Sequence, residues 1–363
     1  MSEQPPAGPP GAAGEGTAQG RSGGAAAAPA ARPRATGTGP WPGEDPLEAA
    51  RTVLGELGGD AGLPFLPELP ARGPGSDAAG RTAALLVDLP VDLQPVGWRL
   101  VDHPGRDAER AGSHRRADLD ALAEAADGWT GPLKLQVLGP WSLASSVWLP
   151  RGERAVVDAG ARRDLVHSLG EGVAAHLRDV ARLVPGADLV LQVDEPALPA
   201  VLDGRLPTAS GWGRLPAVDS LEVREGLRAV LDAAGAAGAS ARGVRCPAGA
   251  PLGLVREAGA SAIGVEVAAL GAAGWESLAA STEAGLAPWL GALDPAGELP
   301  AVGALVEAVR RPWREVGLDP ELLAGVVLAP TAGLAGTAPS RARAVLARLR
   351  EGADALAEVA AGG

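Results

Sequence analysis

Two carboxylates follow directly after an apolar stretch in the middle of the chain. The segment reads Leu-Val-Leu-Gln-Val-Asp-Glu-Pro over residues 189–196 and contains Asp194 and Glu195. Carboxylates at the end of a buried strand are costly unless they bind something or face solvent. We therefore predict that both hold the ammonium group of a substrate, or a cation. The alternative is an acid pair that accepts hydrogen bonds from the backbone amides of the next helical turn.

Two further residues at the ends of apolar runs have side chains that could react or bind a metal. Cys246, the single cysteine, follows Arg245, and a neighbouring guanidinium favours the reactive thiolate. A buried structural cysteine is the favoured interpretation, because cysteines without a disulfide commonly lie in cores. Glu266 stands in the otherwise apolar run Gly-Val-Glu-Val, so it must pair, bind a metal or point into a binding site.

Two turns contribute fewer polar groups. The turn Gly-Pro-Trp-Pro-Gly places the backbone of Gly39 and the indole of Trp41 where they could line a substrate pocket or simply pack. Thr331 is the one polar residue in the turn that follows the last apolar run. No two histidines have the four-residue spacing of a helical metal motif, so we predict surface or internally satisfied positions for His103, His114, His167 and His176.

The elements that must position these residues alternate along the chain. Segments of helical period, at 46–57, 117–126, 162–183, 220–234, 251–258, 302–316 and 340–359, separate short apolar runs typical of buried strands. The eight runs span 34–39, 83–89, 133–138, 189–193, 243–246, 262–267, 287–293 and 326–329. This pattern predicts an α/β protein with a single (β/α)8 TIM barrel, whose chemistry collects at the carboxyl ends of the strands. An open doubly wound sheet is the alternative, although no glycine-rich nucleotide-binding turn follows a strand.

Composition limits the partners and the compartment. The chain has 363 residues and 32 basic against 44 acidic side chains, so its net charge of −12 argues against nucleic acid as a partner. No apolar run approaches the roughly 20 residues of a membrane span. Residues 1–34 are nearly all Ala, Gly, Pro and small polar residues, which predicts a disordered tail before a barrel domain at 35–363. We predict a cytoplasmic protein that acts on a small molecule.

The landmarks quoted above occur together in one known family. Gly-x-Trp-Pro-Gly, Gln-Val-Asp-Glu-Pro-Ala-Leu, a cysteine-containing strand end, a later glutamate and Pro-Thr-x-Gly-Leu follow each other in this order. The chain resembles the C-terminal catalytic barrel domain of cobalamin-independent methionine synthase, in its short actinobacterial-type form, over residues 35–360. The resemblance implies a (β/α)8 barrel that transfers a methyl group from a methylated folate to the thiol of homocysteine, in methionine biosynthesis and without cobalamin.

The family activates that thiol with zinc, and this chain departs from the family's ligand pattern. The His-x-Cys pair of the family falls on Arg245 and Pro247, its glutamate on Glu266 and its last cysteine on Ala332. Cys246 becomes a ligand only if the alignment slips by one residue. Because catalytic zinc needs three protein ligands, we predict that Glu266 and Cys246 are remnants of the metal site and that zinc binds weakly or not at all.

At other positions the chain either lacks or retains the residues that are typical of the family. The family's proton-donating histidine falls near Ala296, and the serine of its first turn on Pro40. Its His-Gly-Glu segment has no counterpart, and residues 88–94 occupy that region. By contrast, Asp194 and Glu195 match the acids that contact the amino-acid substrate. With the backbone at Gly39 and the indole of Trp41, they form the predicted substrate-binding set.

Two functions of different classes follow. The first is methyl transfer to homocysteine or another small thiol, as the resemblance implies. The second is a non-catalytic paralogue that binds a small amino acid or a folate-like ligand, or supports a partner, without turnover. A third, the decarboxylation carried out by related porphyrinogen-processing barrels, lacks the cluster of arginines that several carboxylates require.

Overall fold

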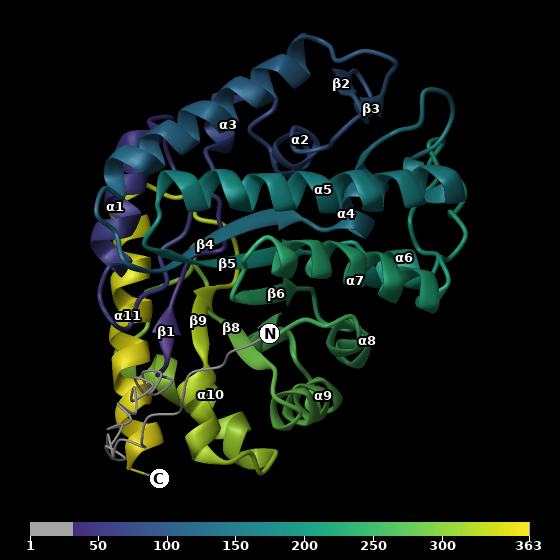
Figure 1. The fold of residues 1–363 in the computed structure, drawn as a ribbon. Coiled ribbons are helices and arrows are strands. Elements are labelled where there is room, and N and C mark those ends of the chain that lie inside the picture. Colours follow the sequence, from purple (N-terminus) through teal and green to yellow (C-terminus); the bar gives the residue numbers. More distant parts are fainter. Residues whose placement is uncertain (1–31, 363) are drawn as a thin grey trace, which may run out of the picture. The chain divides into compact units, whose positions relative to one another are not determined.

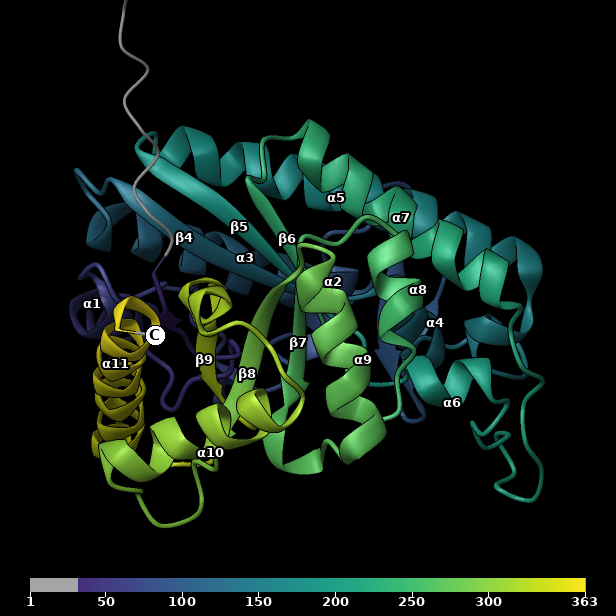
Figure 2. The same cartoon turned by 90° about the horizontal axis from the view of Figure 1, so that it is seen from below.

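A parallel β-sheet of seven strands lies at the centre of the protein. The computed structural model describes residues 32–362, in which the strands are ordered β1-β9-β8-β7-β6-β5-β4 (Figures 1 and 2). Every neighbouring pair is parallel, as strands joined through helices can be. The strands are β1 (Arg34–Ala35), β4 (Gly131–Leu138), β5 (Ala187–Asp194), β6 (Ala241–Arg245), β7 (Ala262–Glu266), β8 (Ala287–Leu293) and β9 (Val327–Pro330).

An irregular segment, residues 61–68, lies between the two edge strands β1 and β4 of this curled sheet. On one side the amide of Leu63 donates to the carbonyl of Ala35, and on the other the amide of Leu66 donates to the carbonyl of Lys134. Only isolated bridges form on either side. The two prolines of the segment lack the N–H groups that a regular ladder needs, so it does not become a strand.

Seven of the eight predicted strands are confirmed, and the second is wrong. Its residues, 83–89, end helix α2 (Ala78–Ala83) and continue as a turn. The carboxylate of Asp77 accepts from the amide of Gly80 and starts that helix, and Asp88 has a φ of 54°, which prevents an extended run. The predicted α/β architecture is therefore present, but in place of a closed eight-stranded TIM barrel the sheet is a curled, seven-stranded half-barrel. Residues 61–68 lie where the second strand was expected.

Helices cover the outer face of the sheet. Helix α11 runs along β1 and β9, while α5 and α7 lie side by side over β4, β5 and β6 (Figure 1). Aspartates cap several of them: Asp45, Asp158 and Asp219 each accept from amides in the first turn. The helices besides α2 are α1 (Pro46–Leu57), α3 (Arg106–Ala125), α4 (Pro140–Ser146), α5 (Ala159–Leu183), α6 (Leu198–Leu202), α7 (Ser220–Ala236), α8 (Leu252–Glu257), α9 (Ala272–Glu283), α10 (Val302–Glu315) and α11 (Pro339–Ala361). A hairpin of β2 (Val91–Gln94) and β3 (Gly97–Leu100) stands apart from the main sheet.

Side chains fill the inside of the curled sheet, as they do in barrels. An apolar cluster contains Leu63, Val190, Ala262, Trp289 and Val327, from five different segments around the sheet. The backbone beside the indole of Trp289 must be glycine, because a Cβ on Gly243 would lie 2.4 Å from two ring atoms. A larger apolar core lies between the sheet and the outer helices.

The fold begins earlier than the predicted tail boundary allows. Residues 1–31 of that predicted tail lie outside the described residues. Arg32 donates to the carboxylate of Asp354 at 2.6 Å, and Arg34 pairs with Val327 in the sheet, so the end of the predicted tail belongs to the fold. From Arg32 onward the chain forms one compact unit. Among the helices of residues 32–362, none is long and apolar enough to cross a membrane.

Candidate functional site

The carboxyl ends of β5, β6, β7 and β9 bring polar residues to one end of the sheet. The parallel register pairs Asp194 with Arg245 and Arg245 with Gly264, and Glu266 ends the next strand. Thr331 follows β9, and its carbonyl accepts from Nη2 of Arg245 at 2.6 Å. These strand ends therefore lie together, as expected for parallel strands, whereas Cys246, which follows β6, lies in the apolar core. We call this end of the sheet the mouth.

Asp194 and Arg245 place opposite charges at the mouth. Oδ1 of Asp194 lies 4.0 Å from Nη1 of Arg245, at the limit of an ion pair, and their side chains are 23% and 35% exposed. Gln192 donates to both carboxylate oxygens of Asp194, at 3.0 and 3.1 Å. Burial raises the pKa of Asp194, against the opposing effects of Arg245, Gln192 and Lys134. Both charged groups remain accessible to a small ligand.

Glu195 faces in another direction. Its carboxylate is fully buried and accepts from the amide of Trp141 at 2.9 Å, and from the amide and hydroxyl of Ser142 at 2.8 and 2.6 Å. Glu195 therefore binds the first turn of α4. This arrangement resembles the alternative considered above, an acid that accepts from helix amides, except that the helix precedes Glu195 in the chain. Burial raises the pKa of Glu195 to about 7, outweighing these hydrogen bonds. A direct role for Glu195 in binding substrate stays a prediction.

Cys246 lies in the apolar core between the sheet and the outer helices. Its residue is 4% exposed, and burial raises the pKa of the thiol to about 12. The favoured interpretation of a buried structural cysteine agrees with this setting. A thiol with so high a pKa is almost entirely protonated at neutral pH, which disfavours both nucleophilic attack and metal ligation.

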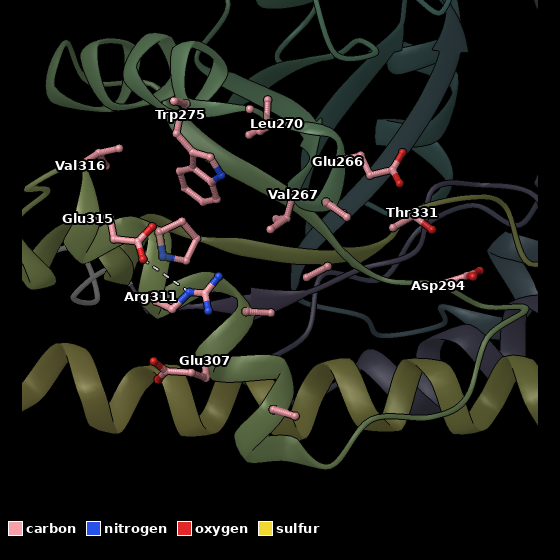
Figure 3. A pocket seen from close by; sticks show the side chains of 18 of the residues that line it. Glu266, Val267, Leu270, Trp275, Asp294, Glu307, Arg311, Glu315, Val316 and Thr331 are labelled. Carbon is pink, nitrogen blue, oxygen red and sulfur yellow. Dashed lines mark ion pairs between the residues drawn. The ribbon is translucent and has the colours of Figure 1, made fainter.

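Glu266 lies on the edge of a groove of about 1370 Å³ that extends from the mouth between α9 and α10 (Figure 3). Arg311 and Glu315, one turn apart on α10, pair at one end of it at 3.5 Å. The groove is acidic, because its charged side chains are those of Glu266, Glu276, Asp294, Glu307, Arg311 and Glu315. Val267, Leu270, Trp275, Pro312 and Val316 supply apolar walls.

Gly39 and Trp41 adjoin the mouth through the backbone. Gly39 has a φ of 124°, and a Cβ there would lie 2.8 Å from the side chain of Gln136, so only glycine fits. The indole of Trp41 is 3% exposed and packs edge-on against Phe65, with ring centroids 6.3 Å apart. The ring packs against Phe65 and also lines a small cavity of about 300 Å³ beside Glu44 and Asp45. Substrate contact by either residue stays a prediction.

The sequence interpretation missed two charged residues inside the sheet. Glu68 ends the irregular segment, is 8% exposed and lies 3.6 Å from Nε of Arg81; burial raises the pKa of its carboxyl group. Lys134, the only lysine of the chain, is fully buried on β4. The buried position of Glu68 could not be predicted, because its proline-rich segment lacks the sequence pattern of a strand. Lys134 carried a usable signal, since a lysine inside an apolar run needs partners.

The zinc implied by the resemblance finds no matching donor set. Among residues 32–362 no group of three or more His, Cys, Asp or Glu side chains lies close enough together to hold a metal ion. Arg245 stands at the strand end where the family has a ligand, and its guanidinium cannot coordinate a cation. Glu266 is left with no thiolate or imidazole from the matched positions.

Comparison with solved structures agrees with this fold. A B12-independent methionine synthase from Shewanella sp. W3-18-1, determined in complex with selenomethionine, matches with a TM-score of 0.53 and 14% identity, over 90% of this chain and 98% of that chain. The likeness is one of fold. The carboxyl transferase domain of Rhizobium etli pyruvate carboxylase, with oxamate and biotin, has a TM-score of 0.34 and 14% identity, over 91% of this chain and 48% of that chain, and carries no argument. No family profile and no curated protein matches the sequence.

Proposed function

We propose that this chain binds a small α-amino acid at the mouth without a zinc ion. The observation that carries the proposal is the pair of opposite charges on neighbouring strand ends, Asp194 and Arg245, 4.0 Å apart and partly exposed. An α-amino acid presents an ammonium and a carboxylate on one carbon atom. Asp194 would accept from the ammonium, and the guanidinium of Arg245 would donate to the carboxylate.

The hydrogen bonds around these two residues support a preformed site. Gln192 holds both oxygens of Asp194, and Arg245 is anchored to the carbonyl of Thr331. Neither contact cancels the charge of its residue. A ligand that inserts between them therefore meets an anion and a cation already in place, which lowers the cost of ordering side chains on binding.

Methyl transfer to homocysteine is the second candidate, favoured by the fold likeness to a B12-independent methionine synthase. Attack on a methyl donor requires a thiolate. Without zinc, Arg245 is the nearby cation that could favour the thiolate of a bound ligand, and it can do so only electrostatically. A folate-type methyl donor, a cytoplasmic location and a barrel closed by residues 61–68 remain part of this proposal.

Matched analogues of L-methionine test the binding mode. We expect L-methionine and L-norleucine to bind alike, with a dissociation constant on the order of 1 mM, because the charged groups carry recognition. N-acetyl-L-methionine lacks the ammonium and L-methionine amide lacks the carboxylate, so each should bind about tenfold more weakly. Equal binding of N-acetyl-L-methionine and L-methionine, measured by calorimetry, would overturn the proposal.

A further inference from the structure

The one lysine of the chain is buried on the edge strand β4, on the inside of the curled sheet beneath the proposed site. Lys134 is 0% exposed, and its Nζ lies 5.5 Å from the ring centroid of Phe65 and 5.9 Å from that of Trp289. Burial of an amine among rings is expensive unless the group has hydrogen-bond partners. Nζ has two partners, the carbonyl of Gly37 and Oε1 of Gln192.

Those two partners fix the orientation of the Gln192 amide. Both are acceptors, so Nζ must donate to each of them. Because Oε1 of Gln192 is committed to Lys134, its Nε2 points the other way and donates to both oxygens of Asp194, and also to the carbonyl of Thr38 at 3.1 Å. Without the lysine, Oε1 of Gln192 would lose its donor, and only the acceptors around Nε2 would hold the amide in this orientation.

We propose that Lys134 is a positioning residue that acts through Gln192 to orient the carboxylate of Asp194, and that its ionisation adjusts the affinity of this carboxylate for a cationic group. The part that concerns ligand affinity rests on the proposed function. The contact chain from Lys134 through Gln192 to Asp194 does not.

The hydrogen bonds are compatible with a neutral amine. A neutral amine has two hydrogens, enough for Gly37 and Gln192, whereas an ammonium has a third that no described acceptor takes. Burial lowers the pKa of Lys134 to about 7; the carboxylates of Asp194 and Glu68 oppose this effect and the guanidinium of Arg245 adds to it.

The sign of the pH effect follows from these charges. Below about pH 7 the ammonium of Lys134 competes with a ligand ammonium for Asp194, and above it this competition is lost. Asp194 and Glu68 also lose protons as pH rises, which strengthens cation binding in the same direction. The contribution of Lys134 is therefore the part of the pH dependence that disappears in a variant without the amine.

A lysine-specific NMR label tests the contact chain without any ligand. Because Lys134 is the only lysine, labelling with ¹³C,¹⁵N-lysine gives one side-chain signal in the full-length protein. We expect its titration midpoint near 7, and we expect Asp194→Asn to lower that midpoint, because it removes a favourable negative charge. A midpoint close to that of free lysine, or one unchanged by Asp194→Asn, would overturn the proposal.

Calorimetry with L-methionine then tests the effect on binding. In the wild type, affinity should rise about tenfold from pH 6 to pH 8, as expected for loss of one nearby charge in a partly screened site. Lys134→Met should remove most of this rise and weaken binding at pH 8 about tenfold, whereas in a Gln192→Leu background it should cost less than about twofold. Equal losses in both backgrounds would contradict action through Gln192.

The two experiments separate the possible failures. If the wild type binds no L-methionine, the proposed function fails, and the NMR titration still decides whether Lys134 is coupled to Asp194. If Lys134→Met does not fold, the wild type and Asp194→Asn titrations decide the same question.

Discussion

Replacement of Glu195 by alanine should cost the protein a large part of its stability. The carboxylate is 0% exposed and accepts three hydrogen bonds, from the amide of Trp141 and from the amide and hydroxyl of Ser142. Glu195→Ala removes all three and leaves two backbone amides buried without these acceptors. Hydrogen bonds to a charged partner contribute about 1.5–3 kcal/mol each and are not additive, so we expect a total loss of about 4 kcal/mol.

Urea denaturation followed by circular dichroism measures this loss as the change in the free energy of unfolding at pH 7. The matched control is Glu283→Ala, which removes an exposed glutamate near the end of α9 and should change stability by less than about 0.5 kcal/mol. If Glu195→Ala cost no more than this control, our account of how β5 holds the start of α4 would be refuted.

Three further outcomes are expected. Burial raises the pKa of Glu195 from 4.5 to about 7, so the proton-linked part of its contribution to stability is fully present below pH 4.5 and is lost as pH rises through about 7, while its hydrogen bonds to α4 remain. Subtracting the profile of Glu195→Gln should expose this fall, and no fall in that difference would contradict the raised value. Cys246 should resist iodoacetamide at pH 8 until the protein is denatured, given a thiol pKa of about 12, and rapid labelling of the native protein would refute this. Gly243→Ala should destabilise by about 1–3 kcal/mol through its clash with Trp289, whereas Gly253→Ala in α8, where a Cβ meets nothing within 4 Å, should be neutral or stabilising; equal effects would argue against the packing described.

The strand–helix alternation could be predicted because most of the buried parallel strands are short runs rich in apolar residues. Seven runs coincide with strands for this reason, and the placement of Asp194 at a strand end followed from its run. The prediction of a strand at 83–89 is wrong because the helix cap at Asp77 and the turn at Asp88 override the apolar composition of this run. The position of residues 61–68 between β1 and β4 could not be predicted, because their hydrogen bonds depend on tertiary contacts and their prolines interrupt the sequence pattern of a strand.

The roles within the site were harder to predict than its location. Asp194 and Glu195 are neighbours in sequence, yet alternation along the strand directs one to the mouth and the other to α4. Sequence alone could not separate them, because the partners of Glu195 lie more than fifty residues away. The same holds for Lys134, whose partners come from the loop after β1 and from β5.

The central claim is that a charged pair, and no zinc ion, recognises an amino acid at the mouth. The most direct test is calorimetric titration of L-methionine into protein dialysed against a zinc chelator, for the wild type and for Asp194→Asn. The control is Asp232→Asn, the same change on the exposed face of α7. We predict that the wild type and Asp232→Asn bind alike after dialysis and that Asp194→Asn binds at least about tenfold more weakly. Binding that disappears from the wild type on dialysis and returns with added zinc, or that is unchanged in Asp194→Asn, would contradict the account.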